Sequence, residues 1–157
     1  MVDEDGYLKL IDFGTAKEIH DRTFTIIGTP HHMSPEVILG KGYNTTSDYW
    51  SIGVMLYEFL CGNLPFGDDL DDPLQVYECV VRRQVVFPKY LKLTPEVKSL
   101  IDQLFSKNAM QRTGGSVEIL RTHPWFQKFD WEALDTRQLP SPYIPCLLYT
   151  SPSPRDS

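Results

Sequence analysis

Residues 12–36 read DFGTAKEIHDRTFTIIGTPHHMSPE, and the interpretation of the whole chain depends on this stretch. It opens with the triplet Asp12-Phe13-Gly14 and closes on Ser34-Pro35-Glu36. The triplet alone is a weak signal, because a tripeptide recurs by chance and an Asp that ends a strand before a Gly turn is a commoner explanation. The second motif follows after one loop rich in threonine. The two motifs at this spacing make a strong signal.

The two motifs resemble the region of protein kinases that runs from the magnesium aspartate through the activation loop to the peptide-docking loop. Ser34 stands where kinases usually have Ala, and His32 stands where the AGC group usually has Tyr. The resemblance covers Val2 to Pro145 and is to the large lobe of an AGC-group Ser/Thr kinase. Within that group it is closest to the cGMP-dependent kinases of protists, and residues 25–31 are the best pointer to them.

The resemblance implies transfer of the γ-phosphoryl group of ATP to a Ser or Thr hydroxyl, with Mg²⁺ as the metal ion. Asp12 would hold the magnesium, Phe13 would pack behind it, and Gly14 would allow backbone angles closed to other residues. Thr25 matches the phosphothreonine of the activation loop, and Lys17 is a candidate partner for its phosphate. The alternative for Thr25 is an ordinary exposed threonine in a loop.

Four residues are assigned to peptide binding by the resemblance: Thr29, His31, Met33 and Glu58. The hydroxyl of Thr29 matches one that bonds the catalytic aspartate, and the alternative is a turn threonine before Pro30. Glu58 is a polar residue in an apolar segment, and its match binds a basic side chain of the substrate. The alternative for Glu58 is a carboxylate that is satisfied within the fold.

The resemblance also predicts a buried ion pair between Glu36 and Arg112, where the alternative is two solvated charges. The family pattern D-x-W-x-x-G is matched by Asp48, Trp50 and Gly53. Asp48 would hold the backbone of the catalytic loop, and Trp50 would anchor the docking segment. The alternative is a plain core helix whose N-terminal Asp is favoured by the helix dipole.

Caps, breaks and periodicity predict helices at residues 49–60, from Asp72-Pro73 to about Arg83, from Thr94-Pro95, and after Gly114-Gly115. The first has apolar residues on nearly all sides and is expected to be buried. Residues 7–11 are expected to form a short strand of a hairpin. The expected fold is therefore mainly α: the large C-terminal lobe of the kinase fold, with a short β-hairpin before the DFG motif and no small lobe.

The chain has 157 residues and a formal net charge of −6, which suits one globular domain and argues against nucleic acid as a partner. No apolar run is long enough to span a membrane. Three cysteines without pairing or metal spacing favour a reducing compartment, so a cytoplasmic location is expected.

Residues 1–126 are expected to form a partial kinase domain, and residues 127–145 the start of the AGC C-terminal tail. Residues 146–157 resemble a translated sequencing adapter, with a disordered Ser/Pro tail as the alternative.

The resemblance places the catalytic-loop aspartate and the ATP-binding lysine upstream of Met1, so the chain by itself is expected to be inactive. The expected partners are protein substrates with basic residues near the phosphoacceptor and the protein's own upstream cyclic-nucleotide-binding domains. A pseudokinase or scaffold lobe that binds protein partners without catalysis stays open as the alternative, because these residues do not include the catalytic base. Asp12 argues against that alternative, since a protein without use for magnesium need not keep the carboxylate.

Overall fold

The computed structural model describes residues 1–146, except the side chains of residues 113–115. Regular structure in this part is helical, with η marking a 3-10 helix: η1 (Phe13–Thr15), η2 (Pro30–His32), α1 (Pro35–Ile38), α2 (Thr46–Cys61), α3 (Pro73–Arg82), α4 (Pro95–Leu104), η3 (Ala109–Gly115), α5 (Val117–Arg121), η4 (Pro124–Phe126) and α6 (Trp131–Asp135). None of the described helices is both long and apolar enough to cross a bilayer. The segment predicted to be adapter-derived lies outside the described residues from position 147 onward.

Internal contacts divide the described chain into two units. The helical unit is Lys17–Phe129 and contains α1 to α5. The terminal unit combines residues 1–16 with residues 130–146 and contains α6. The domain boundary predicted at residue 126 stays a prediction.

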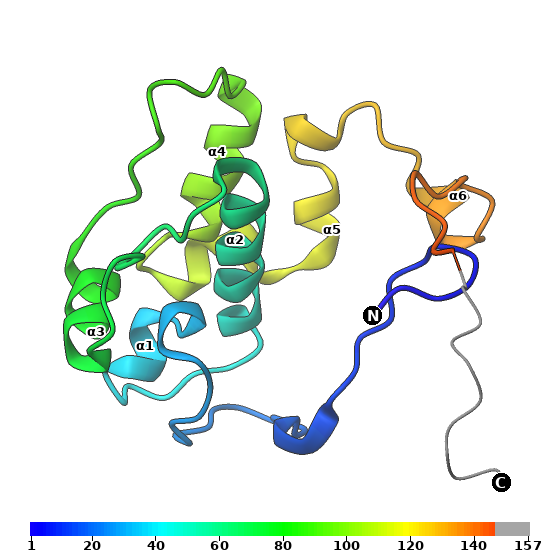
Figure 1. Cartoon of the computed structure of the whole chain (residues 1–157). Coiled ribbons are helices and arrows are strands. Elements are labelled where there is room, and N and C mark those ends of the chain that lie inside the picture. Colours follow the sequence, from blue (N-terminus) through cyan, green and yellow to red (C-terminus); the bar gives the residue numbers. More distant parts are fainter. Residues whose placement is uncertain (147–157) are drawn as a thin grey trace, which may run out of the picture. The chain divides into compact units, whose positions relative to one another are not determined.

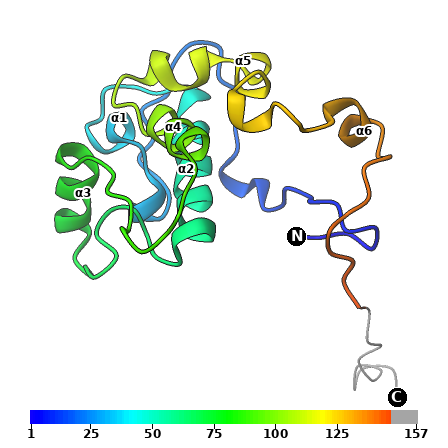
Figure 2. The ribbon, with the colours of Figure 1, turned by 90° about the horizontal axis from the view of Figure 1, so that it is seen from above.

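The core of the helical unit lies where α2 packs on α4, and the two helices are side by side in both views (Figures 1 and 2). The approach is close because Gly53 has no side chain: a Cβ there would lie 3.0 Å from Cβ of Leu104 and 3.1 Å from the ring of Phe105. The apolar face of α4 is buried at all four of its positions: Val97, Leu100, Ile101 and Leu104.

Aromatic rings fill the space beside this contact. Trp50 is fully buried and stacks on Phe66, with ring centroids 5.5 Å apart. Phe105 meets both rings edge-on, at 5.0 Å from Trp50 and 5.2 Å from Phe66. Such edge-to-face pairs add to the gain from buried apolar area, so this trio is the centre of the core.

The predicted starts of α3 and α4 are confirmed at their capping residues, whereas α2 begins at Thr46, before the predicted position 49. The Asp72 carboxylate accepts a hydrogen bond from the amide of Leu74 at 3.0 Å, and the Thr94 hydroxyl accepts one from the amide of Val97 at 3.4 Å. Gly62 ends α2 in the left-handed region, at φ 79°, where its amide donates to the carbonyl of Glu58.

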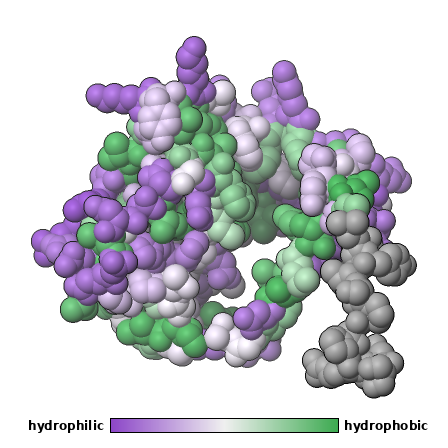
Figure 3. Space-filling model, viewed as in Figure 1, coloured by the Kyte–Doolittle hydropathy of each residue, from purple (hydrophilic) through white to green (hydrophobic). Residues whose placement is uncertain are grey.

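The expectation that α2 is buried on nearly all sides is wrong. Ile52, Met55 and Phe59 are exposed, Phe59 by 83%. They recur at intervals of three and four residues and therefore form one stripe of the helix. An apolar sequence shows that a helix tolerates burial on every side, but not whether something in this chain covers it. Figure 3 shows hydrophobic side chains at the surface of the helical unit.

The strand expected at residues 7–11 is reduced to one isolated antiparallel bridge, between Val2 and Leu8. A turn joins them, in which the Gly6 amide donates to the Asp3 carbonyl at 3.0 Å. Leu8 and Leu10 are both exposed, so the extended segment gains little by packing. Two short strands without an apolar surface to cover them are marginal at best.

Replacement of Gly53 by Val tests the close contact of α2 with α4. We expect the free energy of unfolding to fall by about 1–3 kcal/mol, because the added branches must push Leu104 and Phe105 apart. Urea denaturation measures the loss. The matched control is Met55→Val, which places the same residue at an exposed position of the same helix. Equal midpoints for the two variants would contradict a tight contact at Gly53.

Candidate functional site

Asp12 lies in the terminal unit and is exposed. Its backbone adopts the left-handed region, at φ 62° and ψ 69°, which is uncommon outside glycine and is tolerated best by Asn and Asp. The helix η1 starts directly after it. Phe13 is 64% exposed, so packing of this ring behind Asp12 stays a prediction. The expectation that Gly14 takes backbone angles closed to other residues is wrong: Gly14 lies within η1, without the positive φ that favours glycine, and a Cβ there would lie in ordinary contact with Asp12 Oδ1, at 3.4 Å.

The donor chemistry of Asp12 fits magnesium. Mg²⁺ keeps several water ligands and takes one or two carboxylates together with phosphate oxygens, so a single accessible carboxylate is a sufficient protein ligand. The described residues contain no group of three or more His, Cys, Asp and Glu side chains that could hold a metal ion. The residue that fits is therefore Asp12, in combination with a phosphate ligand.

Thr25, the predicted phosphorylation site, lies in the helical unit next to the ammonium group of Lys17. Lys17 Nζ donates a hydrogen bond to Thr25 Oγ1 at 2.8 Å. The Tyr43 hydroxyl donates to the Thr25 carbonyl at 2.7 Å, and Thr23 exchanges two backbone hydrogen bonds of 2.9 Å with Tyr43. The backbone here is held while the hydroxyl stays exposed.

The segment that follows, around His31 and His32, is held by hydrogen bonds to α2 and to the turn at Gly67. The Ser51 hydroxyl donates to the His32 carbonyl at 2.9 Å. His31 Nε2 lies 3.1 Å from the Gly67 carbonyl. Thr29 is exposed, whereas Met33 is buried. The structure therefore leaves Thr29 accessible and holds its neighbours in place.

Glu36 and Arg112 form the predicted ion pair. Two guanidinium nitrogens of Arg112 donate to the two carboxylate oxygens of Glu36, at 2.5 Å and 2.7 Å. The Arg112 side chain is fully buried, and that of Glu36 is 12% exposed. Arg112 Nε also donates to the Ser106 carbonyl at 2.8 Å, and the Ser47 hydroxyl donates to Glu36 at 2.9 Å. This network satisfies both buried charges.

Two effects act on the pKa of Glu36 in opposite directions: burial of its carboxyl group and the interaction with Arg112. Burial alone would raise the pKa, but the hydrogen bonds and the charge of Arg112 outweigh it and hold the pKa of Glu36 below its usual range. The carboxylate is thus stabilised in its charged form. Because Glu36 is in the first turn of α1, the pair joins the start of α1 to Arg112 in η3, 76 residues further along the chain.

Lys107 was not singled out from the sequence, yet it belongs to this cluster. Its ammonium group lies 4.8 Å from the ring centre of Trp50 and 4.9 Å from that of Phe66, and it donates to the Val80 carbonyl. Burial, and secondarily the charge of Arg112, lower the pKa of Lys107 to about 8. In sequence, a lysine in a loop after a helix carries no signal of such contacts.

Two carboxylates of α2 differ in their surroundings. Asp48 is in the first turn of the helix, where burial raises the pKa of its carboxyl. Glu58 is near the other end of the helix and is exposed. The alternative that Glu58 is satisfied within the core is therefore wrong, and its carboxylate is accessible to solvent.

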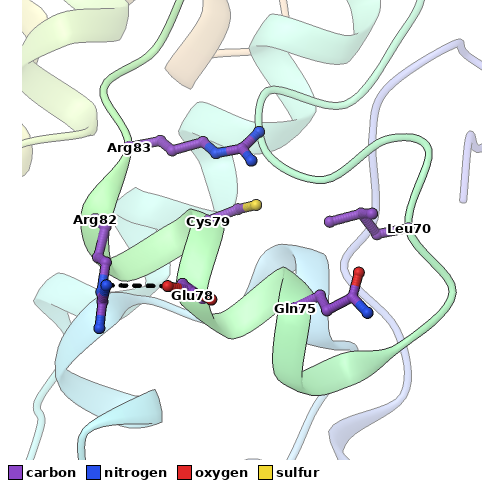
Figure 4. A pocket seen from close by; sticks show the side chains of 6 residues that line it. All are labelled: Leu70, Gln75, Glu78, Cys79, Arg82 and Arg83. Atoms are coloured by element: carbon purple, nitrogen blue, oxygen red, sulfur yellow. Dashed lines mark ion pairs between the residues drawn. The ribbon is translucent and has the colours of Figure 1, made fainter.

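A hollow on α3 is shown from close by in Figure 4. It is lined by Leu70, Gln75, Glu78, Cys79, Arg82 and Arg83. Arg82 and Glu78 are paired at 3.0 Å, so part of its charge is compensated within the hollow. None of the site residues predicted from the sequence lines it.

Comparison with known proteins agrees with these features. The family profile described as protein kinase domain matches residues 1–126. A cGMP-dependent protein kinase of Plasmodium berghei (strain Anka) is 46% identical over 147 residues, which are 92% of this chain and 17% of that protein. The cGMP-dependent protein kinase of Toxoplasma gondii is 44% identical, over 92% of this chain and 15% of its own length. A cAMP-dependent protein kinase catalytic subunit of Arthrobotrys oligospora is 41% identical, over 92% and 28%.

The chain belongs to the protein kinase family, and its relatives are cyclic-nucleotide-dependent kinases of the AGC group. It spans less than a third of the length of these relatives. The mostly helical structure, with little strand, is consistent with the C-terminal lobe of a kinase domain.

Removal of one partner of the ion pair tests its contribution to stability. We expect Arg112→Ala to lower the free energy of unfolding by about 3–5 kcal/mol, because it leaves the Glu36 carboxylate buried without its partner. The measurement is urea denaturation at neutral pH, with Arg82→Ala as the control, since Arg82 makes an exposed ion pair within one helix. A loss no larger than that of the control would contradict the proposed weight of the pair.

The lowered pKa of Glu36 makes stability depend on pH. The stabilisation by the charged form is fully present above about pH 4.3, the usual pKa of an unfolded glutamate, and is lost as the pH falls through the lower pKa of the folded state. Urea denaturation at several pH values between neutral pH and about pH 3 should therefore show that the free energy of unfolding falls more for the natural chain than for Glu36→Gln. Parallel curves would mean that Glu36 does not contribute.

Proposed function

We propose that this chain is part of the large lobe of a Ser/Thr protein kinase that transfers the γ-phosphoryl group of ATP to protein substrates. The observation that carries the proposal is the bidentate ion pair between Arg112 and Glu36, the residue that closes the predicted peptide-docking loop. It supports the proposal because phosphoryl transfer depends on positioning, and the segment that would position the peptide is held by a buried network.

Asp12 is proposed to bind magnesium together with the phosphates of ATP. When bound, the metal ion neutralises the negative charge that builds up on the transferred group. The protein's part is to hold a carboxylate at a fixed place in the chain. The left-handed backbone of Asp12 supports this role, because sparsely populated backbone angles concentrate at functional sites.

Thr25 is proposed to be the activating phosphorylation site, with Lys17 as a partner of the phosphate. The 2.8 Å hydrogen bond from Lys17 to the Thr25 hydroxyl supports the pairing, because a phosphate at this position would add nearly two negative charges within reach of the ammonium group. The exposed loop between Thr25 and Thr29 is the part that such a contact would order.

Peptide binding is proposed for Thr29, His31, Met33 and Glu58. Glu58 supports a preference for basic residues near the phosphoacceptor, since an exposed carboxylate attracts them. His31 and Met33 are held by the fold and would shape the segment. Trp50 is proposed to anchor the segment through the core, and Asp48 to hold the backbone of the catalytic loop.

Regulation by cGMP is proposed from the relatives of Plasmodium berghei and Toxoplasma gondii, which are named for this dependence. The partners would then include cyclic-nucleotide-binding domains of the same protein. No part of the 157 residues matches the Gly-rich loop, the ATP lysine or the catalytic loop of the kinase signature. The chain alone is therefore proposed to be inactive.

The test uses the full-length kinase and a peptide with basic residues before a serine. We expect Asp12→Asn to lower kcat by about a hundredfold or more, because an amide holds the metal ion far less well than a carboxylate. The matched control is Asp21→Asn, which removes one exposed carboxylate of the same loop. Peptide phosphorylation that survives Asp12→Asn unchanged would refute the assignment of Asp12.

A further inference from the structure

In the terminal unit, the turn at residues 3–9 and the tail at residues 137–143 hold one another, and we refer to this contact as the clasp. The Tyr7 hydroxyl donates to the Leu139 carbonyl at 2.6 Å. The Asp3 carboxylate lies between two cations, with Arg137 at 3.5 Å and Lys9 at 3.6 Å. Arg137 also lies over the Tyr7 ring, 5.1 Å from its centre.

Ser141 is the innermost point of the clasp. Its hydroxyl lies 3.1 Å from the Gly6 carbonyl and 2.7 Å from the Tyr143 carbonyl, and it accepts a hydrogen bond from the Tyr143 amide at 3.2 Å. The contact with the turn is close, because a Cβ on Gly6 would lie 2.3 Å from both Ser141 Oγ and the Tyr143 carbonyl. Nothing larger than the hydroxyl fits between the two segments.

The clasp consists of contacts that are individually weak. Surface ion pairs contribute at most about 1 kcal/mol, and a single hydrogen bond contributes about as much. Segments held in this way open locally at low free energy, without unfolding of the rest. The Ser141 side chain is therefore reachable from solvent for part of the time.

The sequence around Ser141 suits a modifying enzyme. Proline stands on both sides, at Pro140 and Pro142, and both prolines are exposed. A proline keeps its predecessor out of the helical region, so the segment is extended and lacks an amide at the position after the serine. An extended, exposed Ser-Pro segment is the form in which proline-directed protein kinases take their substrates.

We propose that Ser141 is a phosphorylation site for a proline-directed protein kinase, and that the phosphate opens the clasp. In the reaction, Ser141 Oγ forms a bond to the γ-phosphorus of a nucleoside triphosphate. The bond from that phosphorus to the bridging oxygen of the β-phosphate breaks, and the nucleoside diphosphate leaves. The hydroxyl proton passes to the base of the modifying enzyme.

The phosphate opposes the clasp for three reasons. The hydroxyl proton that faced the Gly6 and Tyr143 carbonyls is gone, and acceptor oxygens then face acceptors. The turn carries Asp3, Glu4 and Asp5, which repel nearly two added negative charges. The Asp3–Arg137 ion pair joins the turn to the tail, and Arg137 would leave Asp3 if it moved to the phosphate.

The test uses the 157-residue chain with Ser151→Ala, Ser153→Ala, Thr29→Ala and Thr94→Asn, so that neither these Ser-Pro pairs nor the two exposed Thr-Pro pairs take phosphate. Asparagine at position 94 keeps a capping side chain at the start of α4. The chain is incubated with ATP and a proline-directed kinase, and mass spectrometry locates the phosphate. We expect it at Ser141 and not at Ser34, which is followed by Pro35 but is buried. Ser141→Thr should accept phosphate as well, and Ser141→Ala should not.

Opening is measured by trypsin cleavage after Arg137, with cleavage after Lys41 in the helical unit as the internal reference. Phosphorylation should speed cleavage after Arg137 by about fivefold or more, because cleavage follows the open population. Gly6→Ala should do the same without phosphate. Failure of Ser141 to accept phosphate, or cleavage after Arg137 that phosphate leaves unchanged, would overturn the proposal.

Discussion

The buried ion pair between Glu36 and Arg112 is the constraint on which the helical unit depends. It joins positions that are 76 residues apart in the chain, and both of its charges are satisfied by further hydrogen bonds. A buried arginine without an acidic partner would be strongly unfavourable, so the fold that contains Arg112 must bring Glu36 to it. The start of α1 is therefore fixed from the far side of the core, through the ring of Trp50, which lies 5.2 Å from the guanidinium carbon.

This fixed point separates two kinds of structure within one loop. The part next to Glu36 is held by side-chain hydrogen bonds and by burial of Met33. The part around Thr25 has exposed apolar residues, Phe24, Ile26 and Ile27, and is held by the contacts of Lys17 and Tyr43. The loop is thus buried and fixed at its Glu36 end and exposed to solvent around Thr25, so a change in charge near Thr25 would act first on the exposed part.

The sequence predicted the helices well because their signals are local. Asp72, Thr94 and Gly62 act within a few residues of themselves, and the stripe of α4 needs only its own periodicity. It also predicted the Glu36–Arg112 pair, through the resemblance to kinases. The exposure of Phe59, the surroundings of Lys107 and the loss of the strand before Asp12 were not predictable, because each depends on which distant segment is present to cover it.

The missing side chain at Gly53 has a mechanical consequence. Elsewhere in the core, a layer of side chains lies between helices and can absorb small displacements by changing rotamers. At Gly53 the backbone of α2 lies directly against Leu104 and Phe105, because Gly53 itself contributes no side chain to separate them. A tilt of α2 at this point would therefore displace the end of α4, which is followed in the chain by the loop that leads to Arg112. The close contact is therefore expected to make the two helices move together, so that a displacement of α2 at Gly53 reaches the end of α4.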